Sequence, residues 1–328
     1  MKARLPAFAA LAGSGMSGCV GAQTVLDPHG PRAAEILSLA WLLFAVSTAV
    51  IVVVIAAAWL AMRGRSDLRA WIANERNVYA GGIVFPVIVL TGLLVASLAL
   101  MREQMAASEE AVSLSIEIIG EQWWWRVAYL TSDGEPVPSA NEINVPAGED
   151  VLLILRSADV IHSFWVPALA GKVDMIPGRT TSLRLKADRS GIYRGQCAEY
   201  CGGPHALMAL PVRALPRAEF DAWLEAQSAP ATAPNDSTAR GEELFVSAGC
   251  GGCHAIRGTE ARAAIGPDLT HIGSRLSVGV DTHPVNPTTI ARFITDGQHI
   301  KPGNRMPPFR IFSEDDLTTL ATYLAGLK

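Results

Sequence analysis

The stretch Cys197-Ala198-Glu199-Tyr200-Cys201-Gly202-Gly203-Pro204-His205-Ala206-Leu207-Met208 holds two cysteines, a histidine and a methionine, and His162 is the one other histidine between residues 112 and 226. Two thiolates four residues apart can bridge a pair of copper ions, with one imidazole for each ion, a weak thioether from Met208 and a carbonyl at Glu199. The same groups also suit a tetrahedral zinc site or, in an oxidising compartment, a disulfide between Cys197 and Cys201. The spacing alone leaves these three interpretations open.

Residues 112–226, which surround this stretch, have the pattern of β structure. Short segments rich in β-forming residues lie at Trp125 to Tyr129, Val151 to Leu155 and Thr181 to Lys186, and clusters such as Thr131 to Pro138 separate them. We expect a small Greek-key β-sandwich.

A second candidate site follows in Cys250-Gly251-Gly252-Cys253-His254. The C-x-x-C-H pattern attaches haem covalently in c-type cytochromes, with both cysteines bonded to the vinyl groups and the histidine bound to iron. A thioredoxin-like pair expects a βαβ setting and a zinc site expects a second cysteine pair, and neither pattern is present. Met306 is the only methionine after residue 208 and is the expected sixth ligand, with His271, His283 and His299 as alternatives.

Residues 239–328 are predicted to form an all-α domain around this motif. Helical spacing runs from Arg240 to Ala248, and Ser313 with Asp316 can cap a last helix that has one apolar face. This segment holds nine basic and nine acidic residues, so strong electrostatic steering toward a partner is not implied. Residues 227–238, rich in alanine and proline, are predicted to be a semi-flexible linker that tethers the haem near the copper domain.

Two uncharged stretches, residues 36–62 and 79–101, each exceed the roughly 20 residues that span a bilayer as a helix. We expect transmembrane helices at 35–62 and 79–102. The loop at 63–78 carries four arginines against two acidic residues, which places it in the cytoplasm. The rest of the chain then lies outside, on the side where bacteria attach haem c.

The amino terminus has the pattern of an export signal at residues 1–18, with a charged start and small residues at the end. Ser17-Gly18-Cys19 resembles a bacterial lipoprotein signal, which predicts lipidation of Cys19 and an extracytoplasmic segment at 19–34; an uncleaved leader is the alternative. Each of the five cysteines has an assignment, so no disulfide framework is needed. The net charge is −4 and no basic stripe is present, so nothing indicates nucleic-acid binding.

The middle of the chain resembles subunit II of haem-copper cytochrome c oxidases. The resemblance rests on Val160–Pro167, Val173–Arg179 and Gly195–Met208, and it extends from about residue 26 to 224, including the hairpin and the run Gln122-Trp123-Trp124-Trp125. Residues 239–328 resemble a class I cytochrome c. Together they imply a multidomain membrane protein of the caa-type arrangement, with a two-helix transmembrane hairpin, a cupredoxin-like all-β Greek-key domain and an all-α class I cytochrome c domain.

The resemblance also implies roles for single residues. Trp123 is where electrons from the cytochrome enter, the Glu199 carboxylate reaches a magnesium ion shared with subunit I, and the carbonyl of Pro267 orients His254. The binuclear copper A ligands are His162, Cys197, the carbonyl of Glu199, Cys201, His205 and Met208; the haem c ligands are Cys250, Cys253, His254 and Met306. A purely structural interpretation of the tryptophan run is that one or two of its rings pack in a core.

The resemblance further implies an electron-transfer subunit in a bacterial cytoplasmic membrane, with oxidase subunits I and III as partners and an external cytochrome c or another donor. The hairpin lacks histidines, so the oxygen-reducing site lies in another subunit. Alternatives are a subunit of a nitric oxide reductase or a membrane-anchored carrier or copper-delivery lipoprotein without an oxidase. One departure from the family is Tyr79, at a position where relatives often have a proton-uptake glutamate; Glu75 is nearby but shifted by one helical turn.

Overall fold

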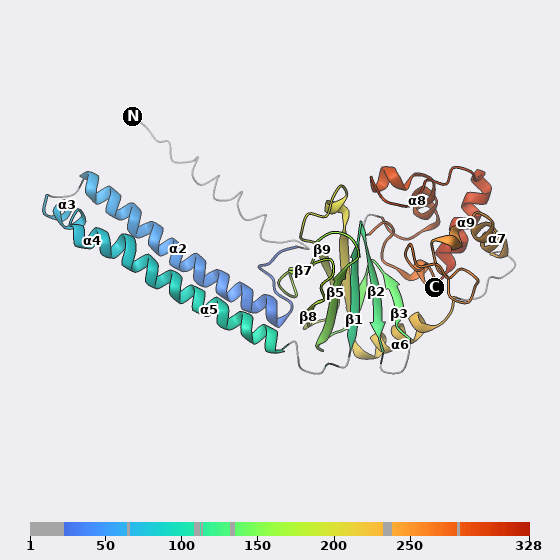
Figure 1. Cartoon of the computed structure of the whole chain (residues 1–328), viewed down its shortest axis with the longest axis horizontal. Coiled ribbons are helices and arrows are strands. Elements are labelled where there is room, and N and C mark those ends of the chain that lie inside the picture. The colour runs from blue at the N-terminus through green and yellow to red at the C-terminus, as the bar shows by residue number, and fades with distance from the viewer. Residues whose placement is uncertain are drawn as a thin grey trace, which may run out of the picture. The chain divides into compact units, whose positions relative to one another are not determined.

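The computed structural model describes residues 23–63, 66–107, 112, 114–131, 135–231, 238–280 and 283–328. They belong to two units, a helical hairpin within residues 35–111 and a second unit that contains residues 112–328 together with the segment before residue 35 (Figure 1). The predicted signal at 1–18 and Cys19 lie outside the described residues.

The hairpin consists of two long apolar helices. Helix α2 (Pro31–Arg63) has 33 residues, and a second helical stretch combines α4 (Glu75–Tyr79), the π-helical segment η2 (Ala80–Val84) and α5 (Phe85–Ala107). Each contains a window with a mean hydropathy of 2.7 of which nothing is buried. Apolar side chains that protein does not cover need lipid around them, and both helices are long enough to cross a bilayer.

The predicted loop at 63–78 is partly helical. Helix α3 (Ser66–Ile72) lies within it, and the second long helix begins at Glu75 rather than at the predicted Tyr79. The side chain of Asn74 caps this helix by accepting from Arg76 N at 3.0 Å. The π-helical turn comes just before Pro86, which has no N–H to donate, and the N–H of Phe85 bonds five residues back to Ala80.

Residues 114–215 form two five-stranded sheets with the orders β3-β2-β1-β5-β8 and β4-β10-β9-β6-β7. The pairs β1–β5 and β4–β10 are parallel and the others are antiparallel. The strands are β1 (Ser115–Glu121), β2 (Trp124–Leu130), β3 (Val137–Ala140), β4 (Ile143–Pro146), β5 (Val151–Ser157), β6 (His162–Trp165), β7 (Val173–Met175), β8 (Thr181–Leu185), β9 (Gly191–Cys197) and β10 (Ala209–Leu215).

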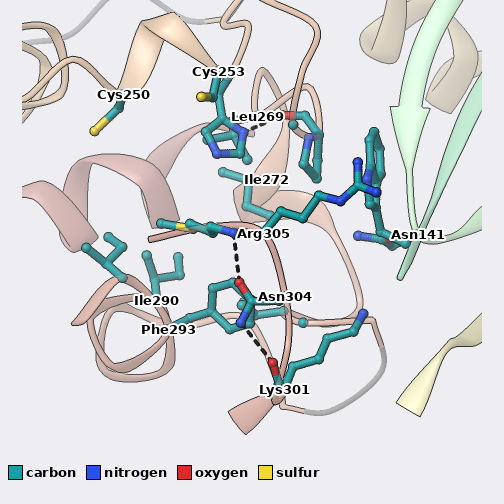
Figure 2. Close-up of a pocket in the computed structure, with 18 of the residues that line it drawn as sticks. Asn141, Cys250, Cys253, Leu269, Ile272, Ile290, Phe293, Lys301, Asn304 and Arg305 are labelled. Carbon is teal, nitrogen blue, oxygen red and sulfur yellow. Dashed lines mark hydrogen bonds between the residues drawn. The ribbon is translucent and has the colours of Figure 1, made fainter. Parts of the chain in front are cut away.

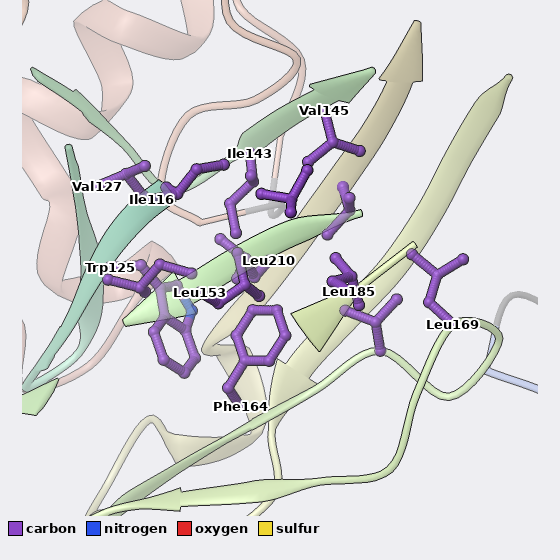
Figure 3. Close-up of a cluster of buried hydrophobic side chains, with 14 of the residues drawn as sticks. Ile116, Trp125, Val127, Ile143, Val145, Leu153, Phe164, Leu169, Leu185 and Leu210 are labelled. Carbon is purple, nitrogen blue, oxygen red and sulfur yellow. The ribbon is translucent and has the colours of Figure 1, made fainter. Parts of the chain in front are cut away.

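The core of this sandwich lies between the sheets (Figure 3). Alternate residues of β1 and β2 are buried, as the period of two in a strand requires, so that Ile116 and Trp125 point inward together with Phe164 of β6. Trp123 lies in the turn between β1 and β2, and only Trp124 and Trp125 belong to the strand. Trp125 is fully buried, as the purely structural interpretation expects for one or two of the tryptophan rings.

The carboxyl-terminal residues form a helical domain. Its elements are α7 (Ala239–Ser247), the 3-10 turns η4 (Cys250–Gly252) and η5 (Ile272–Ser274), α8 (Pro287–Ile300) and α9 (Glu314–Gly326). Helix α9 begins as predicted, because the hydroxyl of Ser313 accepts from Asp316 N at 3.1 Å. Leu320, Tyr323 and Leu324 of the predicted apolar face are buried.

The first part of the predicted linker is held in place. Helix α6 (Arg217–Ser228) reaches into it, and the guanidinium of Arg257 donates to the carbonyls of Gln227 and Ala229. The N–H of Ala231 donates to Arg257 O at 2.8 Å. These bonds hold Gln227, Ala229 and Ala231 against Arg257, and residues 232–237 lie outside the described part of the chain, so the semi-flexible linker stays a prediction.

Candidate metal and haem sites

Two sulfur atoms form the centre of the first site. Cys197 Sγ, at the end of β9, lies 3.7 Å from Cys201 Sγ in the following turn, and both side chains are buried. Both cysteines are free, and the separation is far beyond the roughly 2.05 Å of a disulfide bond. His162 Nδ1 lies 3.8 Å from Cys197 Sγ, and the carbonyl oxygen of Glu199 lies 3.2 Å from the same sulfur.

Cys201 has a matching pair of neighbours from the next turn. His205 opens the 3-10 turn η3 (His205–Leu207), and its Nδ1 lies 3.5 Å from Cys201 Sγ. Met208 Sδ lies 3.8 Å from that sulfur and is buried. Each sulfur thus has one imidazole and one weak donor beside it, a donor set that suits two copper ions bridged by two thiolates. A single tetrahedral zinc ion would leave the two weak donors without a role.

His162 is fixed by groups around it. It is fully buried, its Nε2 lies 2.8 Å from Asp159 Oδ1, and its Nδ1 therefore remains toward Cys197. A carboxylate on the far nitrogen is the usual partner of a metal-binding imidazole. Gly120 of β1 gives the ring its space, since a Cβ there would lie 2.8 Å from two ring atoms.

The charges at this site favour thiolate. Hydrogen bonding with Cys201 lowers the pKa of Cys197 far below its usual range, and the same interaction raises the pKa of Cys201. Burial acts to lower the pKa of His162, but hydrogen bonds with Cys197 and Asp159 outweigh it and raise the pKa. Bound cations would instead favour deprotonation of both sulfurs, because a thiolate rather than a thiol is the metal ligand.

The second site is a cavity of about 270 Å³ lined mostly by apolar side chains of the helical domain, and the copper domain adds Glu121, Gln122, Trp123, Trp124 and Asn141 to the lining. Cys250 and Cys253 lie on one side of it, and Asn304 and Lys301 lie on the other (Figure 2). His254 and Met306 also line the cavity. An apolar space between a C-x-x-C-H turn and a methionine loop fits a haem held by two thioethers and two axial ligands.

His254 is oriented by the loop that follows. Its Nδ1 donates to the carbonyl of Pro267 at 2.8 Å, so Nε2 is left as the free ring nitrogen. Gly266 allows this close approach, because a Cβ there would lie 2.6 Å from a ring carbon. Burial lowers the pKa of His254, which keeps the imidazole in the neutral, metal-binding form.

The Met306 loop is held by amide side chains. The N–H of Met306 donates to Asn304 Oδ1 at 3.0 Å, and Asn304 Nδ2 donates to Lys301 O at 2.9 Å (Figure 2). None of the three alternative histidines, His271, His283 and His299, lines the cavity. His271 is instead buried against the linker, with its Nε2 3.1 Å from Ala229 O.

Trp123 lies directly beside the first site. Its indole Nε1 donates to Cys201 O at 2.9 Å, and the Gln122 amide donates to the same carbonyl at 2.8 Å. The Glu199 carboxylate is 46% exposed and its nearest cation is Lys172, at 3.9 Å. Glu75 is the first residue of α4.

Sequence reasoning missed three residues near these sites. Gly120 stands far from His162 in sequence, and only the packing of β1 against the turn before β6 brings it to that ring, whereas Asp159 stands three residues before His162. Lys301 belongs to no sequence motif, yet its side chain is buried. The one available signal was the placement of Asp159 three residues before His162, which many unrelated sequences share.

Comparisons with known proteins agree with this arrangement. The family model "Cytochrome C oxidase subunit II, periplasmic domain" matches residues 135–215, and the model "Cytochrome c" matches residues 238–328. The chain is 35% identical over 326 residues to cytochrome c oxidase subunit 2 of Alkalihalophilus pseudofirmus, covering 95% of this chain and 94% of the relative.

Cytochrome c oxidase subunit 2 of Bacillus subtilis is 31% identical over 257 residues, covering 75% of this chain and 70% of the relative. Among solved structures, the periplasmic domain of subunit II of cytochrome oxidase (CoxB) of Bradyrhizobium japonicum matches 36% of this chain and 95% of that chain at 33% identity, with a TM-score of 0.34.

The fold expected from the sequence is confirmed: two apolar helices, a cupredoxin-like β-sandwich and a helical cytochrome c domain. This chain and a cytochrome c oxidase subunit 2 match over nearly their whole lengths. This similarity favours the oxidase function over the alternatives of a nitric oxide reductase subunit and of a carrier or copper-delivery lipoprotein. The chain is a membrane-anchored electron-transfer subunit of a haem-copper oxidase, and it belongs to the cytochrome c oxidase subunit II family with a cytochrome c domain at its carboxyl end.

Proposed function

We propose that His162, Cys197, the carbonyl of Glu199, Cys201, His205 and Met208 bind the binuclear copper A centre of this oxidase. The observation that carries the proposal is the pairing at the two sulfurs, each with its own imidazole and its own weak donor within 3.8 Å. When bound, the copper pair and the haem supply one-electron oxidation and reduction. The protein contributes a buried site whose ligands are already close together, so little reorganisation accompanies a change of charge.

We propose that Cys250 and Cys253 bind haem c covalently, that His254 and Met306 ligate its iron, and that Pro267 orients His254. Burial keeps His254 neutral, and Asn304 holds the Met306 loop at the cavity. A thioether as sixth ligand raises the reduction potential relative to a second imidazole. Trp123 is proposed as the residue where electrons enter the copper domain, supported by its hydrogen bond to the carbonyl of Cys201.

The membrane arrangement is proposed from the charge of the loop. The arginines between the two long helices place that loop in the cytoplasm of a bacterium, and both soluble domains then face outward from the inner membrane. We keep the predicted domain limits except at the two membrane helices, whose described bounds are Pro31–Arg63 and residues 75–107, and we also propose lipidation at Cys19. Subunits I and III are the proposed partners, with a separate cytochrome c or other donor, and Glu199 offers one carboxylate to a magnesium ion shared with subunit I.

Metal and haem analysis of the purified oxidase tests these assignments. For each copy of this chain we expect two copper ions, beyond any copper in the other subunits, and one covalent haem. We also expect the purified oxidase to consume oxygen with reduced cytochrome c as the donor. Cys197→Ser should remove the copper pair and keep the haem, whereas Cys253→Ser with Cys250→Ser should remove covalent haem and keep the copper. One zinc ion in place of the copper pair, or haem that survives both serine substitutions, would refute the respective assignment.

A further inference from the structure

Lys301 joins the haem domain to the copper domain. It is only 3% exposed, and its ammonium donates to the main-chain carbonyl of Trp123. Gly303, two residues further on, lies against the indole of Trp123, since a Cβ at this glycine would be 3.3 Å from a ring carbon. Its φ of +84° belongs to the left-handed region that favours glycine. The loop that leads to Met306 therefore packs against Trp123.

Three other segments of the haem domain contact the copper domain independently. Leu276 N donates to Glu142 Oε2 at 2.8 Å, and Glu142 is only 6% exposed. Val280 is buried within the core cluster that the sandwich forms. Arg126 Nη2 donates to Ala264 O at 2.7 Å. Contacts from several loops fix an orientation, which a single tethering segment would not do.

Lysine is almost never fully buried without a partner, because its ammonium loses its hydration. The hydrogen-bond partner of Lys301 is the carbonyl of Trp123, a residue of the other domain. Without the copper domain this ammonium would lose that acceptor. The acceptor that this buried lysine needs is thus supplied by docking.

We propose that Lys301 is a positioning residue that docks the haem domain on Trp123 and closes the Trp123 surface to separate donor proteins. The proposal rests on the role of Trp123 given under Proposed function. A separate donor cytochrome then docks elsewhere on the haem domain, because the loop from Lys301 to Arg305 occupies the place beside the Trp123 indole. Its electrons therefore pass through the haem domain and do not reach Trp123 directly. Asp159, the partner of His162, is also near this loop, at 3.7 Å from Arg305 Nη2.

Hydroxyl-radical labelling of Trp123 in the assembled oxidase, read by peptide mass spectrometry, tests the docking without using the metal centres. Lys301→Met removes the donated hydrogen bond, and at pH 10.5, where deprotonation of the lysine no longer adds a large cost to docking, it should weaken docking several-fold, so that labelling of Trp123 rises. Arg292→Met is the matched control, since it removes one positive charge from an exposed position on α8. Lys301→Arg keeps a donor and should recover much of the protection.

Steady-state kinetics with reduced cytochrome c separates positioning from donor binding. At the same pH, Lys301→Met should lower kcat several-fold and leave KM for the donor unchanged. A raised KM with unchanged kcat would make Lys301 part of a donor surface and overturn the proposal. Unchanged labelling of Trp123 in Lys301→Met, equal to that in Arg292→Met, would overturn it as well.

Glu142→Ala provides a second variant should Lys301→Met fold poorly, and it should also increase Trp123 labelling. Failure of the copper or haem assignments would show in metal content and leave these labelling results intact. Loss of copper or haem in Lys301→Met would instead assign this lysine a role in holding the cofactor sites together and would contradict a docking role.

Discussion

At the residue scale, the copper site depends on the absence of a side chain at Gly120 as much as on its ligands. Gly120 leaves room for the buried ring of His162, whose other nitrogen faces Asp159. The proposed ligand residues could be selected from the sequence, because thiolate, imidazole and thioether groups at short spacing suit a metal site. Gly120 could not, because its importance comes only from contact across strands, and Asp159 could not, because many unrelated sequences have an aspartate three residues before a histidine.

Gly120→Ala is expected to destabilise the copper domain by about 1 to 3 kcal/mol, since an added Cβ would overlap with a fully buried ring. Displacement of His162 should also weaken copper binding. Gly203→Ala is the control, because a Cβ there meets no atom within 4 Å. Thermal unfolding and copper content of both variants provide the measurement; equal behaviour of the two would contradict the proposed close contact.

At the scale of elements, local signals explain where helices begin. Asn74 and Ser313 each accept from a backbone N–H of the first turn, which compensates for the unpaired donors at a helix start. The α9 cap could be predicted from Ser313 and Asp316. The earlier start of the second membrane helix does not follow from hydropathy, because the uncharged residues begin only at Tyr79, although Glu75 is well placed in a first turn beside the helix dipole.

Ser313→Ala should lower the stability of the haem domain by about 1 kcal/mol, since the N–H of Asp316 loses its acceptor. Thr322→Ala, in the exposed last part of the same helix, should change stability by less than about 0.5 kcal/mol. Thermal melts of the holo chain followed at the haem absorption compare the two. A Ser313→Ala melt that coincides with the control would show that the cap contributes nothing.

At the scale of the whole molecule, burial of Lys301 links docking of the haem and copper domains to pH. Burial lowers the pKa of Lys301 to about 7, against a small opposing effect of Cys201, whereas an undocked lysine titrates near 10.5. Between these values the undocked form binds more protons, so docking weakens as the pH falls from about 10.5 to about 7 and changes little below that. Glu121 of the copper domain and Arg275 and Arg305 of the haem domain line the same cavity as Lys301.

The expected slope approaches a tenfold change in the docking equilibrium for each pH unit between about 8 and 9. Labelling of Trp123 at a series of pH values should therefore increase as the pH is lowered through this range. Lys301→Met should show no such slope. A pH dependence that persists in this variant would assign the effect to another group.

The sequence by itself determined the membrane hairpin, the β and α character of the two soluble domains, and the residues proposed to bind copper and haem. Each of these follows from hydropathy, short-range periodicity or ligand chemistry at close spacing, which act over a few residues. The tertiary structure alone decided that Gly120 and Asp159 position His162, that Trp123 occupies a turn, and that Arg257 and Lys301 hold the haem domain in place. Except for the pair Asp159 and His162, these contacts join residues far apart in sequence, and their energies depend on burial and on partners that no local pattern encodes.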